Sequence, residues 1–296
     1  MKKLIYPAIV VTLLSCLFSC STIHPRYINN PAAYSPSFFR HKGDLKLSGA
    51  FAFNPDNWGS DTSSNGVHRK NLGFDGQAAV AVTDHFMIQA GGMYRTEKDV
   101  YNNDDITATN SGMKINYTRS MFDIGAGFYT AMGGSGKVYF NSVLGAGFGS
   151  SRSTDIGVPV ERNRNYDFDF IKYHFTPSFN FFFTDNVRLS VAPRVSLMTA
   201  NNIKTNYTEE EQLRLNYNTF GKKGKVFFEP SLLFQGGPSN VPWLKFDLGA
   251  HFATNPLASS SNENNPPTVY ESGKLRSRRF LLSLGLSFYP FEKRGR

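Results

Sequence analysis

Strict alternation of apolar and polar side chains is the feature that most constrains the fold of this chain. In residues 187–197 every second residue is apolar or Pro, and the residues between them are Arg, Ser or Ala. Successive side chains of a β-strand point to opposite faces, so this pattern gives a strand one apolar face, whereas a helix would mix the two sets. Residues 171–183 alternate in the same way, and residues 184–186, Thr-Asp-Asn, form a predicted turn between the two segments.

The same alternation recurs along most of the chain and predicts ten strands. They span roughly residues 44–54, 69–83, 86–96, 114–131, 137–152, 167–183, 187–198, 224–236, 242–254 and 276–289. The connections near 84–85, 132–136, 184–186 and 237–241 are tight, and those near 55–68, 97–113, 153–166, 199–223 and 255–275 are long and polar. The alternation of the two lengths predicts tight turns at one end of the strands and solvated loops at the other.

The apolar face of these strands has the height of a lipid bilayer. Residues 244–252 and 280–288 each place five apolar side chains at alternate positions, which matches a tilted transmembrane strand of about 9 to 11 residues. A mean hydropathy of −0.33 agrees with this, because each residue that faces lipid is averaged with a polar residue that faces inward. An aromatic content of 15% and only 2 Cys exclude a disordered chain and a disulfide scaffold.

Over nearly all of residues 43–291 the chain resembles small single-chain outer-membrane β-barrel proteins of Gram-negative bacteria. Aromatic residues gather near the tight turns, as in a periplasmic girdle, and residues 280–289 look like the C-terminal assembly signal of such barrels, although residues 292–296 follow it. The resemblance implies an all-β fold in residues 43–296, a single antiparallel up-and-down transmembrane β-barrel with long extracellular loops and short periplasmic turns. It also implies the barrel assembly machinery as a partner.

Residues 1–19 have the features of an export signal, with a positive start, an apolar core over 4–14 and the box Leu17-Phe18-Ser19-Cys20. This box resembles the lipobox of bacterial lipoproteins, which implies cleavage before Cys20, acylation of its sulfur and passage through the lipoprotein export machinery. An ordinary secretory signal and a weaker box ending at Cys16 remain alternatives.

Residues 20–42 contain three Pro and no clean period, which predicts a periplasmic N-terminal linker or plug-like tail. A lipid on Cys20 is then expected in the inner leaflet of the outer membrane.

Strand parity places many charged and polar side chains inside the predicted barrel. This lumen charge network comprises Lys46, Asp75, Arg95, Arg119, Asp123, Lys172, His174, Arg188, Arg194, Glu229, Lys245, Asp247 and His251. The lumen of a ten-stranded barrel is narrow, so long side chains of both signs are expected to pair across it and fill it. We interpret the set as a structural ion-pair network, with a selectivity filter or proton path as the alternative.

A second basic set clusters toward the long-loop end and predicts contacts with the phosphates of outer-leaflet glycolipids. It consists of Arg69, Lys70, Arg152, Lys222, Lys223, Lys225, Arg276, Arg278 and Arg279. General solubility of the loop ends is the equal alternative. Nucleic-acid binding is not indicated, because the charge lies on a membrane rim and no reading element accompanies it.

The sequence does not indicate a catalytic, metal or cofactor site. Asp104 and Asp105 are adjacent in one predicted loop, which matches poorly the Asp-Asp and Asp-His pairs of barrel proteases, and His251 is expected to pair with Asp247 structurally. The six His lack metal-binding spacing, and no phosphate loop is present.

The prediction is therefore a non-enzymatic, lipoprotein-type barrel at the cell outer membrane, without a cofactor. Its role is structural or surface-interaction (binding or adhesion-type), with an extracellular ligand that the sequence does not identify. A narrow porin-like channel or carrier for small solutes is the first alternative, and an omptin-like or lipid-modifying barrel enzyme is the second.

Overall fold

Antiparallel strands make up nearly all of the described structure. The computed structural model describes residues 26–54, 67–101, 113–134, 136–156, 163–215, 217–254 and 275–291. The strands are β1 (Tyr27–Asn29), β2 (Leu45–Phe53), β3 (Val67–Ala81), β4 (Phe86–Tyr101), β5 (Met113–Ala131), β6 (Val138–Ile156), β7 (Arg164–Phe182), β8 (Val187–Ala192), β9 (Val195–Thr205), β10 (Lys225–Phe228), β11 (Ser231–Gly236), β12 (Leu244–Phe252), β13 (Arg276–Ser277) and β14 (Phe280–Phe288). Two short helices, α2 (Glu209–Leu215) and α3 (Tyr217–Phe220), lie between β9 and β10.

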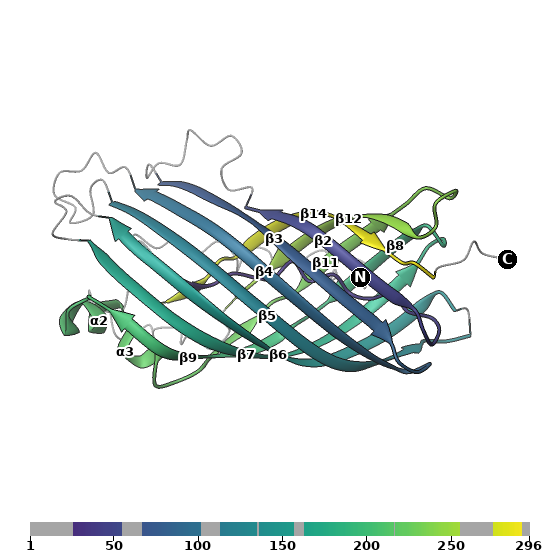
Figure 1. Cartoon of the computed structure of the whole chain (residues 1–296), viewed down its shortest axis with the longest axis horizontal. Helices are drawn as coiled ribbons and strands as arrows, with labels where there is room; N and C mark the ends of the chain where they lie inside the picture. The colour runs from purple at the N-terminus through teal and green to yellow at the C-terminus, as the bar shows by residue number, and fades with distance from the viewer. Residues whose placement is uncertain are drawn as a thin grey trace, which may run out of the picture.

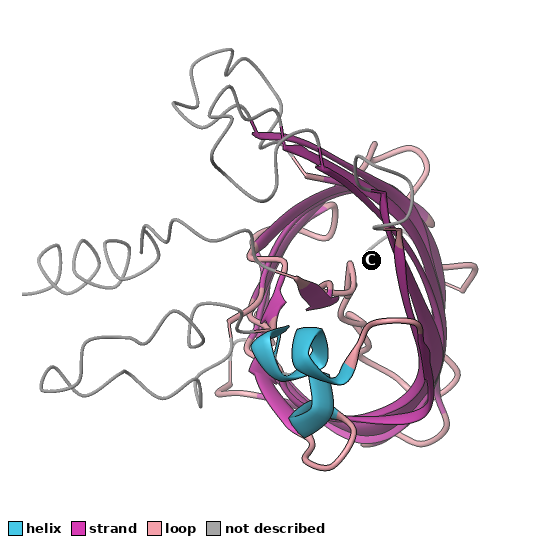
Figure 2. Cartoon of the chain, turned by 90° about the vertical axis from the view of Figure 1, so that its left-hand side faces the viewer, coloured by secondary structure: helices cyan, strands magenta, loops and turns pink. Residues whose placement is uncertain are grey.

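The large sheet closes into a ten-stranded antiparallel barrel (Figures 1 and 2). The strand order is β10-β9-β7-β6-β5-β4-β3-β2-β14-β12-β11-β8, and a further pairing of β8 with β7 closes the ring. β8 with β9, and β10 with β11, each form one interrupted barrel strand. Each barrel strand pairs with the next one along the chain, so the predicted all-β, up-and-down antiparallel barrel is confirmed.

Prolines interrupt two of the barrel strands. Pro193 lies between β8 and β9, and Pro230 lies between β10 and β11. Proline has no backbone N–H to donate to a sheet ladder, so the regular pairing stops there. The register nevertheless continues across the first break, since Phe179 pairs with Val191 and Phe175 with Val195.

The tight turns have a simple local cause. The Thr83 Oγ1 atom accepts hydrogen bonds from the backbone N–H groups of His85 (3.2 Å) and Phe86 (2.9 Å). Thr184 does the same for Asn186 (3.2 Å) and Val187 (3.0 Å). A Thr side chain that satisfies two backbone donors favours a short turn, so the Thr-Asp pairs of the sequence define where β3 and β7 end.

The strands extend further toward the long-loop end than the alternation predicts. β5, β6 and β7 each contain 19 residues, about twice the 9 to 11 needed to cross a bilayer. Parts of the predicted loops 97–113, 153–166 and 199–223 therefore continue the barrel wall. None of the described helices is long and apolar enough to cross a membrane.

The outer face of the barrel is apolar, and the lumen is mostly polar. Phe51, Leu144 and Phe246 are 63%, 67% and 57% exposed on the outer face. Lys46, Arg95 and other charged side chains of the wall are buried inside. This is the reverse of a water-soluble protein, and it matches a barrel surrounded by lipid.

Candidate functional site

An N-terminal segment of the chain fills the lumen. This segment, residues 26–42 and here called the lumen tail, includes the buried side chains of Ile28, Asn29, Phe38 and Phe39. The sequence predicts a periplasmic linker or a plug-like tail for residues 20–42, and the described part of this segment, from Arg26, lies inside the barrel. The tail has no regular period, so its side chains point in many directions and each meets a different strand of the wall.

The lumen tail runs lengthwise from the long-loop end to the tight-turn end. At its first described residue, Arg26 pairs with Asp155 (2.8 Å), next to the end of β6. At the other end, the backbone N–H of Lys42 donates to Asp84 (2.9 Å), in the tight turn between β3 and β4. The intervening residues therefore pass through the whole height of the barrel.

At the long-loop end, Glu97 is the centre of a buried ion cluster. Its carboxylate accepts hydrogen bonds from Arg119, from Arg278 (2.5 Å) and from the amide of Asn30 in the tail (3.0 Å). Arg278 also donates to Asp99 at 2.8 Å. Since these side chains are almost fully buried, the tail is held where two guanidinium groups and two carboxylates balance each other.

Asn29, the residue before Asn30, connects the tail to three parts of the wall. Its amide donates to Glu229 (2.8 Å) and to Ser277 (2.9 Å), and its carbonyl oxygen accepts from Lys172 (3.0 Å). Lys172 pairs in turn with Glu229 at 2.7 Å. The Asn29 side chain thus serves the buried Lys172–Glu229 ion pair as both donor and acceptor.

In the middle of the lumen, the tail forms hydrogen bonds with the wall through its backbone and one hydroxyl group. The backbone N–H of Ala33 donates to Asp75 (3.1 Å), which also pairs with Arg95. The Lys46 ammonium donates to the Ser35 carbonyl (2.6 Å), and the Ser35 hydroxyl donates to Asp247 (3.3 Å). Ser35 of the tail therefore links Lys46 and Asp247, two wall residues of opposite charge.

At the tight-turn end, aromatic packing replaces ion pairing. The rings of Phe38 and Phe182 meet edge to face at 5.6 Å between centroids, and the Arg188 guanidinium lies 5.7 Å, 5.0 Å and 5.0 Å from the centroids of Phe38, Phe182 and Tyr289. A cation over aromatic faces is stabilised by the ring quadrupole. This cluster closes the lumen where the tail turns into β2.

The helices α2 and α3 lie at the long-loop mouth (Figure 2). Thr208 and Glu211 form a capping box at the start of α2, with hydrogen bonds of 2.8 Å and 3.3 Å between each backbone N–H and the other side chain. Glu211 also accepts two hydrogen bonds from Arg164 (2.8 and 3.0 Å), which lower the pKa of its carboxyl. The helices are thereby tied to the start of β7.

A tyrosine cluster seals the junction of helices, wall and tail. Tyr217 of α3 stacks on Tyr166 of β7, with 3.7 Å between ring centroids. The Tyr207 hydroxyl donates to Asp155, the same carboxylate that pairs with Arg26. Burial raises the pKa of Tyr207 well above its usual range, so this hydroxyl keeps its proton and acts as a donor.

The void found beside the tail is small. It is lined by Tyr34, Asp75, Asp123 and Arg194 among others, and measures about 30 Å³, close to the volume of one water molecule in the liquid. Arg194 lies 3.6 Å from Asp123 and 4.0 Å from Glu229. A space of this size holds about one water molecule and no larger solute.

The thirteen residues of the predicted lumen charge network are all buried. One expected pairing among them is wrong, because Asp247 and His251 do not pair with each other. His251 shares a hydrogen bond of 2.8 Å with Ser283 instead, and Asp247 accepts from Gln235 at 2.9 Å and from Ser287 at 2.5 Å. Side chains four residues apart on a strand share a face but stand too far apart to meet, so each finds a partner on a neighbouring strand.

Several residues of the site were missed in the sequence because they fall in predicted loops. Glu97, Asp99 and Asp155 are inward residues of β4 and β6. The parity that places Arg95 inside continues to Glu97 and Asp99, so the alternation could have found these two. The role of Asn29 has no such signal, since it depends on the path of the tail.

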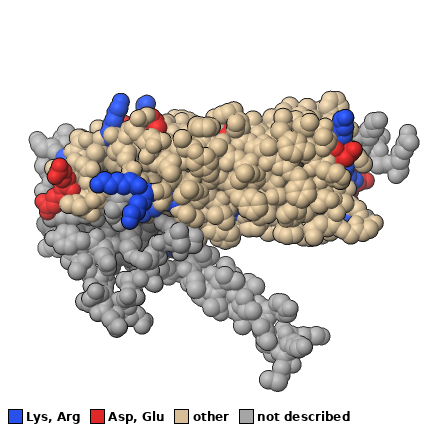
Figure 3. Space-filling model, turned by 90° about the horizontal axis from the view of Figure 1, so that it is seen from below, with Lys and Arg blue, Asp and Glu red and all other residues tan. Residues whose placement is uncertain are grey.

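The basic residues expected at the outer-leaflet rim differ in their exposure. Lys70, Arg152, Lys222, Lys223 and Arg279 are exposed, Arg69 and Lys225 are half-buried, and the side chain of Arg276 lies outside the described residues. In Figure 3 the charged residues gather toward the two ends of the barrel, with an uncharged band between them.

Arg278 differs from the expectation of a glycolipid contact. It is only 2% exposed and pairs with Glu97 and Asp99 in the lumen. The physical reason lies in its backbone, because residues 278 and 279 are outside the β14 ladder and the Arg278 N–H donates to Asn29 in the tail at 2.9 Å. The side chain is thereby turned toward the carboxylates.

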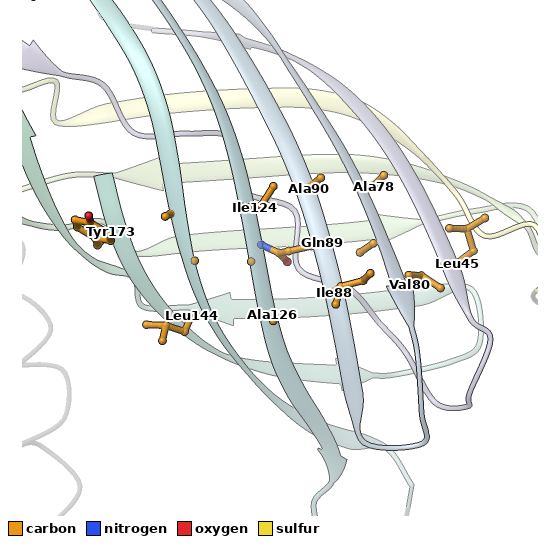
Figure 4. Close-up of a pocket in the computed structure, with 14 residues that line it drawn as sticks. Leu45, Ala78, Val80, Ile88, Gln89, Ala90, Ile124, Ala126, Leu144 and Tyr173 are labelled. Atoms are coloured by element: carbon orange, nitrogen blue, oxygen red, sulfur yellow. The ribbon is translucent and has the colours of Figure 1, made fainter. Parts of the chain in front are cut away.

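A shallow apolar groove marks the outer wall across β2 to β7 (Figure 4). Its volume is about 790 Å³. The small side chains of Ala78, Ala90 and Ala126 line it between larger outward residues such as Ile88 and Leu144. Since Ile88 and Leu144 are 46% and 67% exposed, the groove belongs to the lipid-facing surface rather than to the lumen.

Within the part of the chain that the structure describes, no group of three or more His, Cys, Asp or Glu is placed to hold a metal ion. Cys16, Cys20, Asp104 and Asp105 lie outside the described residues.

Comparisons with known proteins show similarity at the level of the fold. No protein-family model and no curated protein sequence matches the chain. Among solved structures, the transport unit of the autotransporter AIDA-I from Escherichia coli has 9% identity, with 87% of this chain and 93% of that chain covered and a TM-score of 0.42. The outer membrane protease OmpT from Escherichia coli has 8% identity, coverage of 87% and 100% and a TM-score of 0.41. The outer membrane protein OprG from Pseudomonas aeruginosa has 11% identity, coverage of 84% and 96% and a TM-score of 0.34.

The sheet topology itself shows a closed ten-stranded antiparallel barrel, and the solved structures similar to it include outer-membrane proteins. These structures include a protease and proteins that are not described as enzymes.

Proposed function

We propose that this protein is a lipid-anchored barrel of the Gram-negative outer membrane that is sealed by its own lumen tail and has a structural or surface-interaction role without catalysis. The observation that carries the proposal is the continuous line of buried contacts between residues 26–42 and the wall. They range from the Arg26–Asp155 pair to the packing of Phe38 on Phe182.

The filled lumen disfavours the channel or carrier. To open a path, the tail would have to leave Glu97, Glu229 and Asp247, each of which would lose a buried hydrogen bond. Unpaired buried polar groups cost about 1 to 3 kcal/mol each. A tail held at several such points keeps the barrel closed at rest.

The geometry also disfavours a barrel enzyme. Asp247 and His251 are 5% and 1% exposed, and each is hydrogen-bonded to a neighbouring side chain of the wall or tail. His174 is 2% exposed and lies 3.8 Å from Asp123. A catalytic group must reach a substrate, and these four His and Asp side chains face the interior of a filled barrel.

We place the interactions of the protein at the long-loop end. The exposed cations Lys70, Arg152, Lys222 and Lys223 would form charge-assisted hydrogen bonds with the phosphates of outer-leaflet glycolipids. Assembly in this membrane would use the barrel assembly and lipoprotein export machineries. A surface ligand is to be sought on the long connections of a rigid scaffold.

The test of the sealed state is conductance in planar lipid bilayers. We expect no steady conductance from the wild-type protein, and open channels when residues 29–37 are replaced by a Gly/Ser segment of equal length. As a control, replacement of the exposed residues 221–224 by a Gly/Ser segment of their own length should leave the barrel closed. Steady conductance of the wild-type protein would favour the channel and overturn the sealed state.

The lipid anchor is tested separately by acyl labelling. Cys20→Ser should abolish the label and the processing by the lipoprotein signal peptidase, and Cys16→Ser should change neither. The reverse pattern would move the mature N-terminus to Cys16, and no labelling of the wild-type protein would remove the anchor from the proposal.

A further inference from the structure

The direction of the lumen tail determines on which side of the membrane the mature N-terminus lies. Tail residues follow the chain from Arg26 at the long-loop end to Lys42 at the tight-turn end. In barrels of this kind the longer loops face the cell exterior and the shorter turns face the periplasm. A tail that enters at the long-loop mouth therefore comes from the exterior.

We infer that the chain N-terminal to Arg26 lies outside the cell and that the acyl chains on Cys20 insert into the outer leaflet. This inference rests on the proposed acylation of Cys20 and on the proposed orientation of the barrel. It replaces the expectation of a lipid in the inner leaflet, and it makes the protein a surface lipoprotein whose anchor and loops are on the same side.

The N-terminal end of the tail is held firmly at the mouth. Arg26 is only 7% exposed, and its guanidinium pairs with Asp155 at 2.8 and 3.0 Å. The Tyr207 hydroxyl binds the same carboxylate from the segment that leads into α2. Next to it, the Tyr27 ring lies under the Arg278 guanidinium, 3.8 Å from ring centroid to cation. These contacts fix the point from which the preceding residues start.

The length of chain between Cys20 and Arg26 is too short to return to the periplasmic side. The two residues are six positions apart, so even a fully extended chain reaches only about 22 Å. β6, which ends beside Arg26, contains 19 residues, and at a tilt of about 40° it rises on the order of 45 to 50 Å along the barrel axis. Cys20 can therefore reach the outer leaflet around the rim but not the inner leaflet.

Two other routes back to the periplasm are closed. The lumen already holds residues 26–42 and their partners, so it has no room for a second strand of chain. A path along the outside of the barrel would have to cross about 30 Å of hydrocarbon with unpaired backbone groups. Neither route is compatible with the position of Arg26.

The surface near the mouth fits the same placement. Lys70 of β3, Arg152 of β6 and the pair Lys222 and Lys223 beside α3 are exposed toward this end of the barrel. Outer-leaflet glycolipids carry phosphates, which these cations would bind. The acyl chains and the basic residues would then engage one leaflet together.

An epitope tag inserted after Ser21 of the full chain tests the location of the N-terminus. We expect an antibody to bind this tag on intact cells, as it should bind a control tag inserted after Gly221 beside α3. A second control tag, inserted after Gly134 in a tight turn, should be bound only after the outer membrane is permeabilised. Each variant must keep its heat-modifiable band, which shows that the barrel has folded.

The pattern of the three tags separates the possible errors. If the Ser21 tag behaves like the tight-turn tag, the tail does not run as described and the inference is overturned. If the Gly221 tag is hidden and the Gly134 tag is exposed, the proposed orientation of the barrel is wrong, and the N-terminus is then periplasmic.

The leaflet is tested by a protease site inserted after Thr22 in cells fed a labelled fatty acid. Protease added to intact cells should remove the label from the barrel, because cleavage releases the acylated N-terminal peptide. Label that persists on intact cells and is lost only after permeabilisation would place the lipid in the inner leaflet. Absence of label before cleavage would instead show that the proposed acylation fails.

Discussion

The two faces of one strand, β12, show how differently the wall of this barrel meets its surroundings. Leu248 is 51% exposed on the outer face, and its neighbour Asp247 is 5% exposed in the lumen. Asp247 accepts hydrogen bonds from Ser35, Gln235 and Ser287, whereas Leu248 needs only an apolar environment. The effect of a substitution on stability should therefore depend on hydrophobicity at the outer face. At the inner face it should depend on which hydrogen-bond or ion-pair partners are lost.

The largest effect is expected from Glu97→Gln in the lumen. The substitution keeps the shape of the side chain but leaves Arg119 without its carboxylate partner and Arg278 with Asp99 alone. Breaking a buried ion pair in this way costs about 3 to 5 kcal/mol, which urea titration of the heat-modifiable band would measure.

The matched control is Asp185→Asn, which removes the partner of Arg40 at a site where the Asp185 side chain is 55% exposed. Exposed pairs contribute less than about 1 kcal/mol. Equal effects of the two substitutions would show that the lumen is not the buried, filled space described above.

On the outer face, Leu248→Arg should destabilise the barrel by about 2 to 4 kcal/mol, because an arginine would lie in the hydrocarbon at that height. Leu284, which pairs with Leu248 and is 52% exposed, should behave in the same way. The control is Leu213→Arg in α2, where a leucine that is 61% exposed lies outside the barrel wall. Tolerance of arginine at both wall positions would contradict the assigned register of the lipid-facing set.

Asn29→Ala should have a smaller effect, in the lumen tail itself. It leaves Glu229 and Lys172 each without one buried partner. The free energy of unfolding measured in the same titration should fall by about 1 to 3 kcal/mol. Tyr34→Phe is the matched control, since the Tyr34 hydroxyl makes one long hydrogen bond of 3.5 Å to Gln89. If the two variants unfold alike, Asn29 does not have the linking role assigned to it.

The smallest effect is expected at the mouth, where Arg164 lowers the pKa of Glu211. A carboxyl with a depressed pKa in the folded state stabilises that state above its usual value of about 4.3, and the contribution is lost as the pH falls through the depressed value. Proteolysis near α2 should therefore accelerate below about pH 4, by less than about fivefold. Glu211→Gln should remove this acid dependence and Glu209→Gln should retain it.

Much of the outer face could be predicted from the sequence. A repeat of two residues assigns each side chain of a strand to one face, so positions such as Leu248 and Asp247 follow from parity alone. The inward positions of Glu97 and Asp99 follow from the same parity, but the end of β6 near Asp155 could not be found in this way, because polar residues at both parities there look like loop. There both faces of the strand meet polar surroundings, and the alternation disappears while the strand continues.

The contacts of the lumen tail could not be predicted from the sequence, because they join residues far apart in the chain. Asn29 and Ser277 are 248 positions apart, and nothing in the tail sequence signals that they meet. Arg278 was assigned to the rim for the same reason, since its inward direction depends on the backbone of the tail. The apolar and polar alternation of the sequence predicts the barrel wall, whereas the contacts that fill the lumen are seen only in the folded chain.

The most direct test of the sealed barrel is a disulfide between the tail and the wall. Asn29 and Ser277 are register partners in the parallel pair of β1 and β13, so the double variant Asn29→Cys, Ser277→Cys should form a bridge in isolated outer membranes. Mass spectrometry would detect it as one cross-linked peptide. Asn29→Cys with Ser287→Cys, at the opposite end of β14, should not form it. Free thiols at both Asn29→Cys and Ser277→Cys in a folded barrel would contradict the placement of the tail in the lumen.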